Sequence, residues 1–541
     1  MNAIRIRIGR LLECASNFCE RHSSLVLLLL VMLYIAAALQ ASRSARLWHD
    51  ELFTYYIAQS PTLRDMWANL RQHDLNPPLM YLLTRWSFRL FGVSTLTTRI
   101  PEILGFMLWI VCTFRFVQRR MGTNFAAFAV LALLESDTFQ FSVDARPYAL
   151  LLGFLGLAML GYQKITIDPP SDNTSRSTRL SGLTCLFVGV FGMMLSHMFG
   201  LFGLGALAAA EIWRTRLRRS VDWPVILIIL LPLALFAAYV PMFRNHSKGI
   251  FPAEFQPNGE TIFSFYIASI SRPLVALCLT ALSVLVLLGP RHLRSGPPTQ
   301  GCKWFFTRPE WVLLIATMST PLILMGYLMG TQGAFFPRYG AIATIGFVIL
   351  ATALLARWTM NQGSLDGRAA LLGGTILFLM SGFWFPTPQH VALTEVVSNL
   401  RHSEPSVRQC QACSKTEALD PTLPLVDASG LTFIEMNHQE TPSTLARVYY
   451  LTDPQASFEF AHANIFEQMP ALVESFHLHG HAVPYSAFLR EHQHFFVLGR
   501  YNYPEDWLLR KLTKNAEVRI IDTTADDYRD TDLYEVTIKD R

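Results

Sequence analysis

The chain has 541 residues, 51% hydrophobic and only 16% Asp, Glu, Lys or Arg, so it is more apolar and less charged than a typical soluble domain. Its net charge of +5 is small, and no basic tract or RNA-binding signature accompanies it, which argues against a nucleic-acid-binding protein. Eight cysteines in a chain of this length exclude a disulfide scaffold. The composition therefore predicts a polytopic membrane protein.

About 11 apolar stretches are long enough to predict membrane-spanning helices. The first follows an arginine-containing lead and has no small-residue cleavage site after it, so we interpret it as a retained span and not as a signal peptide. The stretches lie near residues 25–39, 100–117, 123–141, 147–163, 181–196, 198–213, 223–241, 264–289, 310–330, 339–356 and 369–385.

Basic residues predict the orientation of these spans. Arginines and lysines follow the second, fourth, sixth and eighth stretches, all on the side of the N-terminus, and this bias marks the cytoplasmic side. The loop 42–99 then lies outside the cytoplasm. It is too long to be a simple connector. With an odd number of spans, the C-terminal region is expected outside as well.

The loop 42–99 begins with Trp48-His49-Asp50-Glu51. Adjacent acidic side chains point in different directions, so one can face a cavity while the other anchors the loop. We predict Asp50 and Glu51 as catalytic residues, with Glu51 in a supporting role. The alternative is an acidic turn at the membrane interface or a helix N-cap.

The same loop continues with His73 and with Asn76-Pro77-Pro78, which is typical of a helix start. The following residues, 79–90, predict a short helix lying in the membrane interface, with Arg85 and Arg89 on one side. An arginine there could bind a phosphate or could extend towards lipid headgroups.

Further charged and aromatic residues are predicted on the outer side of later spans. An acid and a base at the mouth of a helical bundle, such as Asp144 and Arg146, are costly unless they form an ion pair or serve a function. A lone His at such a place is more often a structural hydrogen-bonding group than a catalyst. These residues are Asp144, Arg146 and Tyr148, then His197, then Arg244, His246 and Lys248, and finally Arg338 and Tyr339.

From about residue 387 the chain becomes more polar, and short β-type segments alternate with helical patterns. We therefore divide the chain into a membrane domain, 1–386, and an extracytoplasmic α/β domain, 387–541. The expected strands are 423–427, 447–451, 495–498, 518–521 and 533–538, and the expected helices are 394–401 and 504–512.

Two patterns in the second domain leave alternatives open. His477, His479 and His481 would share one face of a strand and could bind Zn²⁺ or Cu²⁺, but Gly480 and Pro484 favour a solvated loop. Cys410 and Cys413 could form a local disulfide in an oxidising compartment.

Taken in order, the motifs resemble those of GT-C glycosyltransferases of the family 39 type, which include dolichyl-phosphate-mannose protein mannosyltransferases and bacterial aminoarabinose transferases. The resemblance covers roughly residues 10–360. One difference is Asn76, where many bacterial members have His or Lys. The markers are Trp48-His49-Asp50-Glu51, Asn76-Pro77-Pro78-Leu79-Met80-Tyr81, Arg99-Ile100-Pro101, Asp144-Ala145-Arg146-Pro147-Tyr148, Ser196-His197-Met198-Phe199-Gly200 and Pro337-Arg338-Tyr339.

This resemblance implies a GT-C fold in a bacterial inner membrane. It also implies transfer of a sugar from a polyprenyl-phosphate donor to an acceptor outside the cytoplasm, with Asp50 as general base. The expected donor-phosphate ligands are Arg85, Arg146, Arg338, Lys248 and Arg244, and the expected pocket residues are His73, Asp144, Tyr148, His197 and Tyr339.

The residues agree with such chemistry. A sugar hydroxyl needs a base, and a departing phosphate needs positive charge. Direct displacement would invert the anomeric centre. No P-loop or GxGxxG follows a strand, which fits a lipid-phosphate donor. No cofactor is firmly predicted, although Asp50, Glu51 and His73 could suit a divalent metal. The main alternative is a transporter or flippase, and a third is a non-catalytic scaffold for the C-terminal domain.

Overall fold

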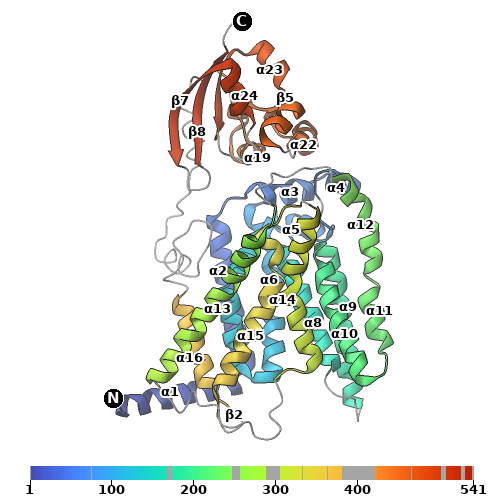
Figure 1. The fold of residues 1–541 in the computed structure, drawn as a ribbon, viewed down its shortest axis with the longest axis vertical. Coiled ribbons are helices and arrows are strands. Elements are labelled where there is room, and N and C mark those ends of the chain that lie inside the picture. The colour runs from blue at the N-terminus through green and yellow to red at the C-terminus, as the bar shows by residue number, and fades with distance from the viewer. Residues whose placement is uncertain are drawn as a thin grey trace.

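The computed structural model describes residues 2–74, 76–166, 173–246, 256–287, 305–331, 333–361, 364–380, 420, 422–462, 464, 466–500, 507–525 and 530–538. These residues form a helical bundle and a smaller sheet-containing domain (Figure 1). The predicted combination of a polytopic helical protein with a C-terminal α/β domain is confirmed. The predicted boundary at 386/387 and the pair Cys410 and Cys413 lie outside the described residues.

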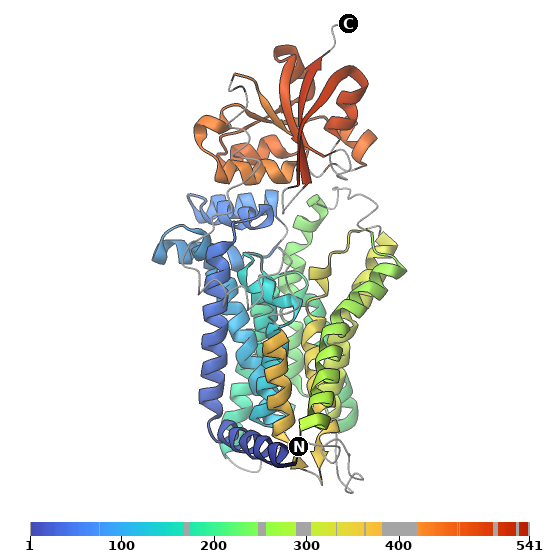
Figure 2. The same ribbon diagram turned by 90° about the vertical axis from the view of Figure 1, so that its left-hand side faces the viewer.

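The bundle is built from long apolar helices, which run along its length (Figures 1 and 2). Helix α1 lies across the end of the bundle that is opposite the sheet domain. The bundle helices are α1 (Asn2–Arg21), α2 (Ser23–Ser44), α6 (Thr95–Met121), α7 (Thr123–Leu134), α8 (Tyr148–Thr166), α9 (Asn173–Ser196), α10 (Gly200–Arg218), α11 (Trp223–Leu230), α12 (Leu233–His246), α13 (Gly259–Leu287), α14 (Arg308–Thr331), α15 (Ala343–Trp358) and α16 (Gly367–Met380).

Each predicted apolar stretch overlaps one or two of these helices within the described residues. Among the described residues, seven helical segments are long and apolar enough to cross a membrane. The number is eight if α7 and the 3-10 helix η1 (Asp137–Val143), which are bent by 74°, form one broken span. The prediction of about 11 is higher because α15 and α16 are short and α10 carries several charges.

Close packing of α6 against α8 fixes the start of α8, where several predicted site residues lie. A Cβ atom added to Gly153 would meet the carbonyl oxygen of Gly105 at 2.2 Å, and one added to Gly105 would meet the Leu150 backbone nitrogen at 2.6 Å. Only glycine permits this approach. In addition, the buried Glu102 of α6 accepts hydrogen bonds from the backbone N–H groups of Ala149 (2.7 Å) and Leu150 (3.1 Å).

Three short helices cover the end of the bundle that faces the sheet domain: α3 (His49–Ala58), α4 (Leu63–His73) and α5 (Leu79–Phe91) (Figure 2). Helix α5 confirms the helix predicted over 79–90. Its Leu83, Trp86 and Leu90 are exposed, whereas Arg85 is buried. This pattern suits a helix whose outer face contacts lipid.

The C-terminal domain contains a six-stranded sheet of order β5-β4-β3-β6-β8-β7. Strands β3, β4, β5 and β6 are parallel, and β8 is antiparallel to both β6 and β7. The five predicted strands are present, whereas the four-residue β5 escaped prediction. The strands are β3 (Leu425–Asp427), β4 (Val448–Thr452), β5 (His481–Pro484), β6 (His494–Gly499), β7 (Ala516–Ala525) and β8 (Asp530–Ile538).

Helices cover both faces of this sheet (Figure 1). The predicted helix 504–512 corresponds in part to α24, and the predicted helix 394–401 lies outside the described residues. The remaining short elements are the hairpin β1 (Met360–Asn361) and β2 (Ser364–Leu365) and the 3-10 helix η4 (Pro337–Gly340) of the bundle, and α19 (Gly430–Gln439), α20 (Pro442–Leu445), α21 (Pro454–Ala456), the π-helix η5 (Ser457–Ala461), α22 (Met469–Phe476), α23 (Tyr485–Glu491) and α24 (Leu508–Asn515) of the C-terminal domain.

Alternate residues of the central strands enter two different apolar cores, as expected for a sheet covered on both sides. Val426 belongs to the core beneath α24, whereas Leu425 belongs to a core that also contains Phe433 of α19. This second core continues into Leu52 and Ile57 of α3. The C-terminal domain is therefore docked on the bundle through a shared apolar core.

The three histidines predicted as a possible metal site belong to different local structures. His477 ends α22 with a left-handed φ of 52°, His479 is exposed in the following turn, and His481 begins β5. Within the described residues, no group of three or more His, Cys, Asp or Glu side chains is arranged to hold a metal ion.

Candidate active site

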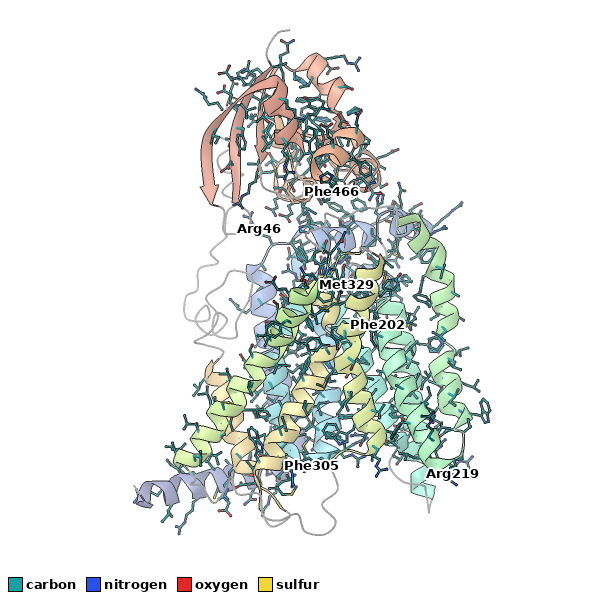
Figure 3. All side chains as sticks on the ribbon, in the orientation of Figure 1. Arg46, Phe202, Arg219, Phe305, Met329 and Phe466 are labelled. Atoms are coloured by element: carbon teal, nitrogen blue, oxygen red, sulfur yellow. The ribbon has the colours of Figure 1, made fainter. Side chains whose placement is uncertain are left out.

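The first turn of α3 places Asp50 and Glu51 at the junction between the two domains. Acidic residues are favoured in the first turn of a helix because they complement the helix dipole. Figure 3 places Arg46, which precedes this helix, at the junction, whereas Arg219 and Phe305 lie at the far end of the bundle. The two carboxylates have different surroundings, as expected for neighbours on a helix.

Glu51 is fully buried and holds the surrounding backbone together. Arg99 donates from Nε to Glu51 Oε1 and from Nη2 to Oε2, both at 2.6 Å. Glu51 also accepts from the backbone N–H of Ala145 at 2.7 Å and from that of Trp48 at 3.2 Å. Both carboxylate oxygens are therefore engaged in structure, which favours the supporting role over direct chemistry.

Asp50, by contrast, keeps part of its carboxylate accessible, with a side chain 21% exposed. Its Oδ2 lies 3.1 Å from Arg338 Nη1, and its Oδ1 lies 3.7 Å from His49 Nε2. Arg338 lies against the rings of Trp48 and Phe336, at 5.7 and 4.8 Å from their centroids. These rings hold the guanidinium beside the carboxylate.

Neighbouring groups keep Arg338 positively charged. Burial acts to lower its pKa, but Tyr148 and Asp50 outweigh that effect and raise the pKa above the usual value. The Nε–H groups of Arg338 and Arg146 are buried and find no acceptor among the described residues. A buried donor without an acceptor is uncommon, and an anionic ligand would supply one.

Arg146 lies between Asp50 and a carboxylate that the sequence analysis did not select, Asp74. Arg146 Nη1 donates to Asp74 Oδ2 at 2.6 Å and to the backbone oxygen of Asp50 at 3.3 Å. Tyr81 donates its hydroxyl to the same Asp74 oxygen at 2.6 Å, and the Asn76 side chain donates to Asp74 Oδ1 at 2.9 Å. The signal in the sequence was the position of Asp74, two residues before Asn76-Pro77-Pro78.

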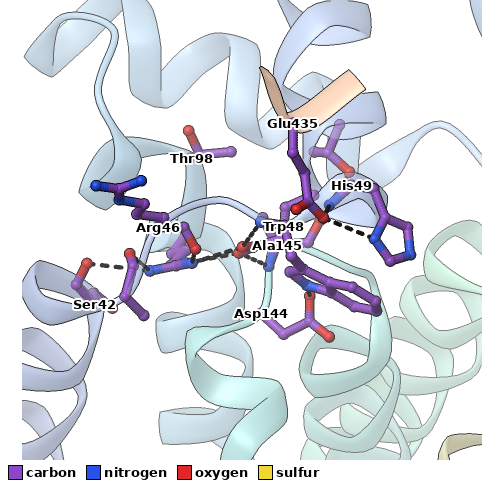
Figure 4. Close-up of polar contacts among 12 residues, drawn as sticks. Ser42, Arg46, Trp48, His49, Thr98, Asp144, Ala145 and Glu435 are labelled. Atoms are coloured by element: carbon purple, nitrogen blue, oxygen red, sulfur yellow. Dashed lines mark hydrogen bonds and ion pairs between the residues drawn. The ribbon is translucent and has the colours of Figure 1, made fainter. Parts of the chain in front are cut away.

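Asp144 lies beneath Trp48, whose indole N–H donates to its Oδ1 at 3.0 Å (Figure 4). Burial, followed by the negative charges of Glu51 and Asp50, raises the pKa of Asp144 to about 7, against the opposing effects of Trp48 and Arg338. The carboxyl is thus partly protonated near neutral pH.

His197 is buried beside Tyr148, with ring centroids 5.1 Å apart. Burial and the charge of Arg146 lower its pKa to about 3, so the imidazole is neutral. Its Nδ1 accepts the backbone N–H of Phe199 at 3.0 Å, which leaves the proton on Nε2. The geometry makes His197 a neutral hydrogen-bonding group. Tyr339 completes this side of the site, because it contacts Phe199 and lies close to Arg338 and Asp50.

Of four other predicted residues, two contact other parts of the structure and two lie outside the part that the structure describes. Arg85 is buried and donates to the backbone oxygens of Ala58, Ser60 and Pro61 near the end of α3, whereas Asp50 lies in the first turn. We therefore leave Arg85 out of the candidate phosphate site. Lys248 and the side chain of Arg244 lie outside the described residues.

His73 is the fourth, and it faces the C-terminal domain. Its Nε2 lies 2.9 Å from Ser475 Oγ, and its ring contacts Phe476. Asp50, Glu51 and His73 could suit a divalent metal by residue type, but within the described residues they form no group arranged to hold one, and Glu51 is paired with Arg99.

Comparison with known proteins finds structural likeness at low sequence identity. No family model and no curated protein matches the chain. The chain is similar to ArnT from Cupriavidus metallidurans bound to undecaprenyl phosphate, with a TM-score of 0.40 and 13% identity over 94% of this chain and 97% of that one. The apo state of ArnT gives a TM-score of 0.41 at 12% identity over the same shares. The apo oligosaccharyltransferase of Archaeoglobus fulgidus gives 0.44 at 12% identity, over 89% of this chain and 70% of that one.

Proposed function

We propose that this protein transfers a sugar from a polyprenyl-phosphate donor to an acceptor hydroxyl, with inversion at the anomeric carbon. One observation carries the proposal: the partly exposed carboxylate of Asp50 lies 3.1 Å from Arg338, and Arg146 contacts the backbone oxygen of the same residue, at the end of an apolar helical bundle. A lipid-linked substrate can reach such a place from the membrane, with its phosphate near the arginines and its sugar near the carboxylate.

Asp50 acts as the general base in this reaction. The acceptor oxygen forms a bond to the anomeric carbon, the bond from that carbon to the phosphate oxygen breaks, and the proton of the acceptor hydroxyl passes to Asp50. A carboxylate at this position also stabilises positive charge that develops on the sugar. Because the displacement is direct, the configuration at the anomeric carbon inverts.

Arg338 and Arg146 stabilise the departing polyprenyl phosphate. Their unpartnered Nε–H groups offer donors to the phosphate oxygens, and charge-assisted hydrogen bonds of this kind are stronger than neutral ones. Arg338, which is paired with Asp50 in the described structure, then shifts to the phosphate, and the Asp50 carboxylate accepts the proton.

Asp144 limits the negative charge in the site. A bound phosphodiester adds one negative charge to a site that already contains Asp50 and Asp74. Since the pKa of Asp144 is about 7, its carboxyl can stay protonated near neutral pH and so reduce repulsion of the donor.

The reaction takes place on the extracytoplasmic side of a bacterial inner membrane. The distribution of arginines among the loops supports this orientation. Helices α3, α4 and α5 and the C-terminal domain lie at the opposite end of the bundle from α1, consistent with that assignment (Figure 2). The acceptor is an envelope glycolipid, polysaccharide or protein hydroxyl.

Mass spectrometry of envelope glycolipids and glycoproteins, with and without the gene, tests the proposal. We expect the strain without the gene to lose one glycosylated species. That species should return with the wild-type gene and stay absent with Asp50→Asn. A transporter or flippase would keep its activity in a well-folded Asp50→Asn variant, so restoration by that variant would overturn the proposal. A parallel reaction of purified protein with a chelator tests whether a divalent cation takes part.

A further inference from the structure

The first turn of α3 is held by a carboxylate from the C-terminal domain. Glu435 of α19 accepts the backbone N–H of His49 on its Oε1 at 2.9 Å. The same oxygen lies 3.0 Å from His49 Nδ1 (Figure 4). The side chains of His49 and Glu435 are only 13% and 16% exposed, so water screens this contact little.

This contact determines which nitrogen of His49 carries the proton. An ionised carboxylate only accepts hydrogen bonds, so the proton lies on Nδ1, which faces Glu435. The other nitrogen, Nε2, faces Asp50 Oδ1 at 3.7 Å. Glu435, His49 and Asp50 therefore form a chain of contacts from the C-terminal domain to the proposed base.

Glu435 is placed by a packed interface. Tyr56 of α3 stacks on Phe476 of α22 with ring centroids 5.2 Å apart, and Phe53 meets the same ring edge-on at 5.9 Å. Arg46 donates to Gln439 at 2.8 Å, one turn along α19 from Glu435. These contacts hold α19 and α22 against α3, and so hold Glu435 beside the first turn of α3.

We propose that Glu435 is a positioning residue: it fixes the first turn of α3 and the tautomer of His49, so that the C-terminal domain completes the site of the proposed base. This inference rests on the proposed function of Asp50. One carboxylate of the C-terminal domain then acts on the reaction through His49.

The test compares Glu435→Ala and Glu435→Gln with Gln439→Ala in the full-length protein. Gln439→Ala is the matched control, since it removes an interface hydrogen bond on the same helix without touching His49. Purified proteins receive a panel of undecaprenyl-phosphate monosaccharides with an envelope extract as acceptor source, and released undecaprenyl phosphate is measured. The gain in stability of each variant when undecaprenyl phosphate alone is added shows whether the variant is folded and binds the phosphate.

We expect Glu435→Ala to lower kcat about 10-fold with little change in donor KM, since misplacement of a base costs rate more than binding. Glu435→Gln keeps the acceptor oxygen but not the charge, and should show a smaller loss. Gln439→Ala should stay within about two-fold of the wild type. In the Asp50→Asn background, Glu435→Ala should cost less than about two-fold, because both changes act on one step.

Equal effects of Glu435→Ala and Gln439→Ala would overturn the inference, as would a full 10-fold loss that persists in Asp50→Asn. An effect confined to KM or to stability would make Glu435 merely structural. These outcomes differ from failure of the proposed function, which would appear as normal turnover by Asp50→Asn or as no transfer by the wild type from any donor in the panel.

Discussion

Two clusters of carboxylates and arginines occupy opposite ends of the bundle, and they differ in how exposed the central carboxylate is. At the end near α1, Asp222 is bound by Arg179 at 2.7 Å and by Arg214 at 3.1 Å, and its side chain is 4% exposed. At the other end, the Asp50 side chain is 21% exposed and lies 3.1 Å from Arg338. The same residue types therefore form a closed cluster around the buried Asp222 and an open cluster around the partly exposed Asp50.

The largest expected effect is on turnover at the open cluster. Asp50→Asn keeps the shape of the side chain and removes its basicity, so kcat should fall roughly 10²-fold, the order of a general-base contribution. Thermal stability should change little, because the side chain is partly exposed. Transfer rates and melting curves of the purified variant measure both. Near-normal turnover would remove Asp50 from the chemistry.

At the closed cluster, the corresponding change should affect stability and not turnover. Asp222→Asn weakens hydrogen bonds from Arg179 and Arg214 and should lower the free energy of unfolding by about 2 kcal/mol. Although burial acts to raise the pKa of Asp222, the arginines lower it overall. Its contribution is therefore present above the unfolded pKa and is lost as pH falls through the lower folded pKa.

Melting temperatures of wild type and Asp222→Asn across acid pH test this assignment. The difference between them should shrink as the medium becomes acidic enough to protonate Asp222 in the wild type. A kcat defect in Asp222→Asn comparable to that of Asp50→Asn would show that the two clusters do not differ in the way we infer.

Replacing Arg338 should have a smaller effect than replacing Asp50, and it should change donor affinity as well as rate. Arg338→Ala removes a guanidinium held by Trp48 and Phe336 and should raise donor KM about 10-fold, with a loss of kcat, because charge on the phosphate grows as it departs. Arg338→Lys keeps the charge without the planar fork and should be partly active. Direct binding of a polyprenyl-phosphate sugar measures the affinity, and normal binding by the Ala variant would place the phosphate elsewhere.

The sequence predicted the open cluster better than the closed one. Motifs beside the membrane spans singled out Asp50, Arg146 and Arg338, and the structure brings these three together. The partner of Arg146, Asp74, escaped notice because a lone Asp in a polar loop has no periodic pattern. Arg85 was expected to bind phosphate, yet it caps carbonyls near the end of α3, a long-range contact that helical spacing does not reveal.

The α/β character of the C-terminal domain was also predictable, because most strands have a β-rich pattern. The docking of α19 on α3 was not, since its apolar contacts join residues separated by hundreds of positions and neither segment shows an unusual composition. The contact of Glu435 with His49 is of the same kind. Surface carboxylates are common, and only the three-dimensional structure distinguishes this one.

The smallest expected effect concerns Asp144 and the pH dependence of donor binding. The pKa of its carboxyl is raised to about 7, so it is mostly neutral below that pH and negatively charged above it. Asp50, Glu51, Trp48 and Arg338 surround it, and the added charge should repel the donor phosphate. Donor KM should therefore rise about three-fold as pH increases through 7, a size that fits a partly screened charge several ångströms away.

Asp144→Asn cannot ionise and should flatten this rise, while keeping an acceptor oxygen for the Trp48 indole. The matched control is Glu467→Gln. The pKa of Glu467 is also raised to about 7, by burial and by Asp453, but this residue belongs to the C-terminal domain and contacts Ser457. Donor KM measured from pH 6 to pH 8 should lose its pH dependence in Asp144→Asn alone. The same flattening in Glu467→Gln, or a persistent rise in Asp144→Asn, would show that another group near Asp50 titrates in this range.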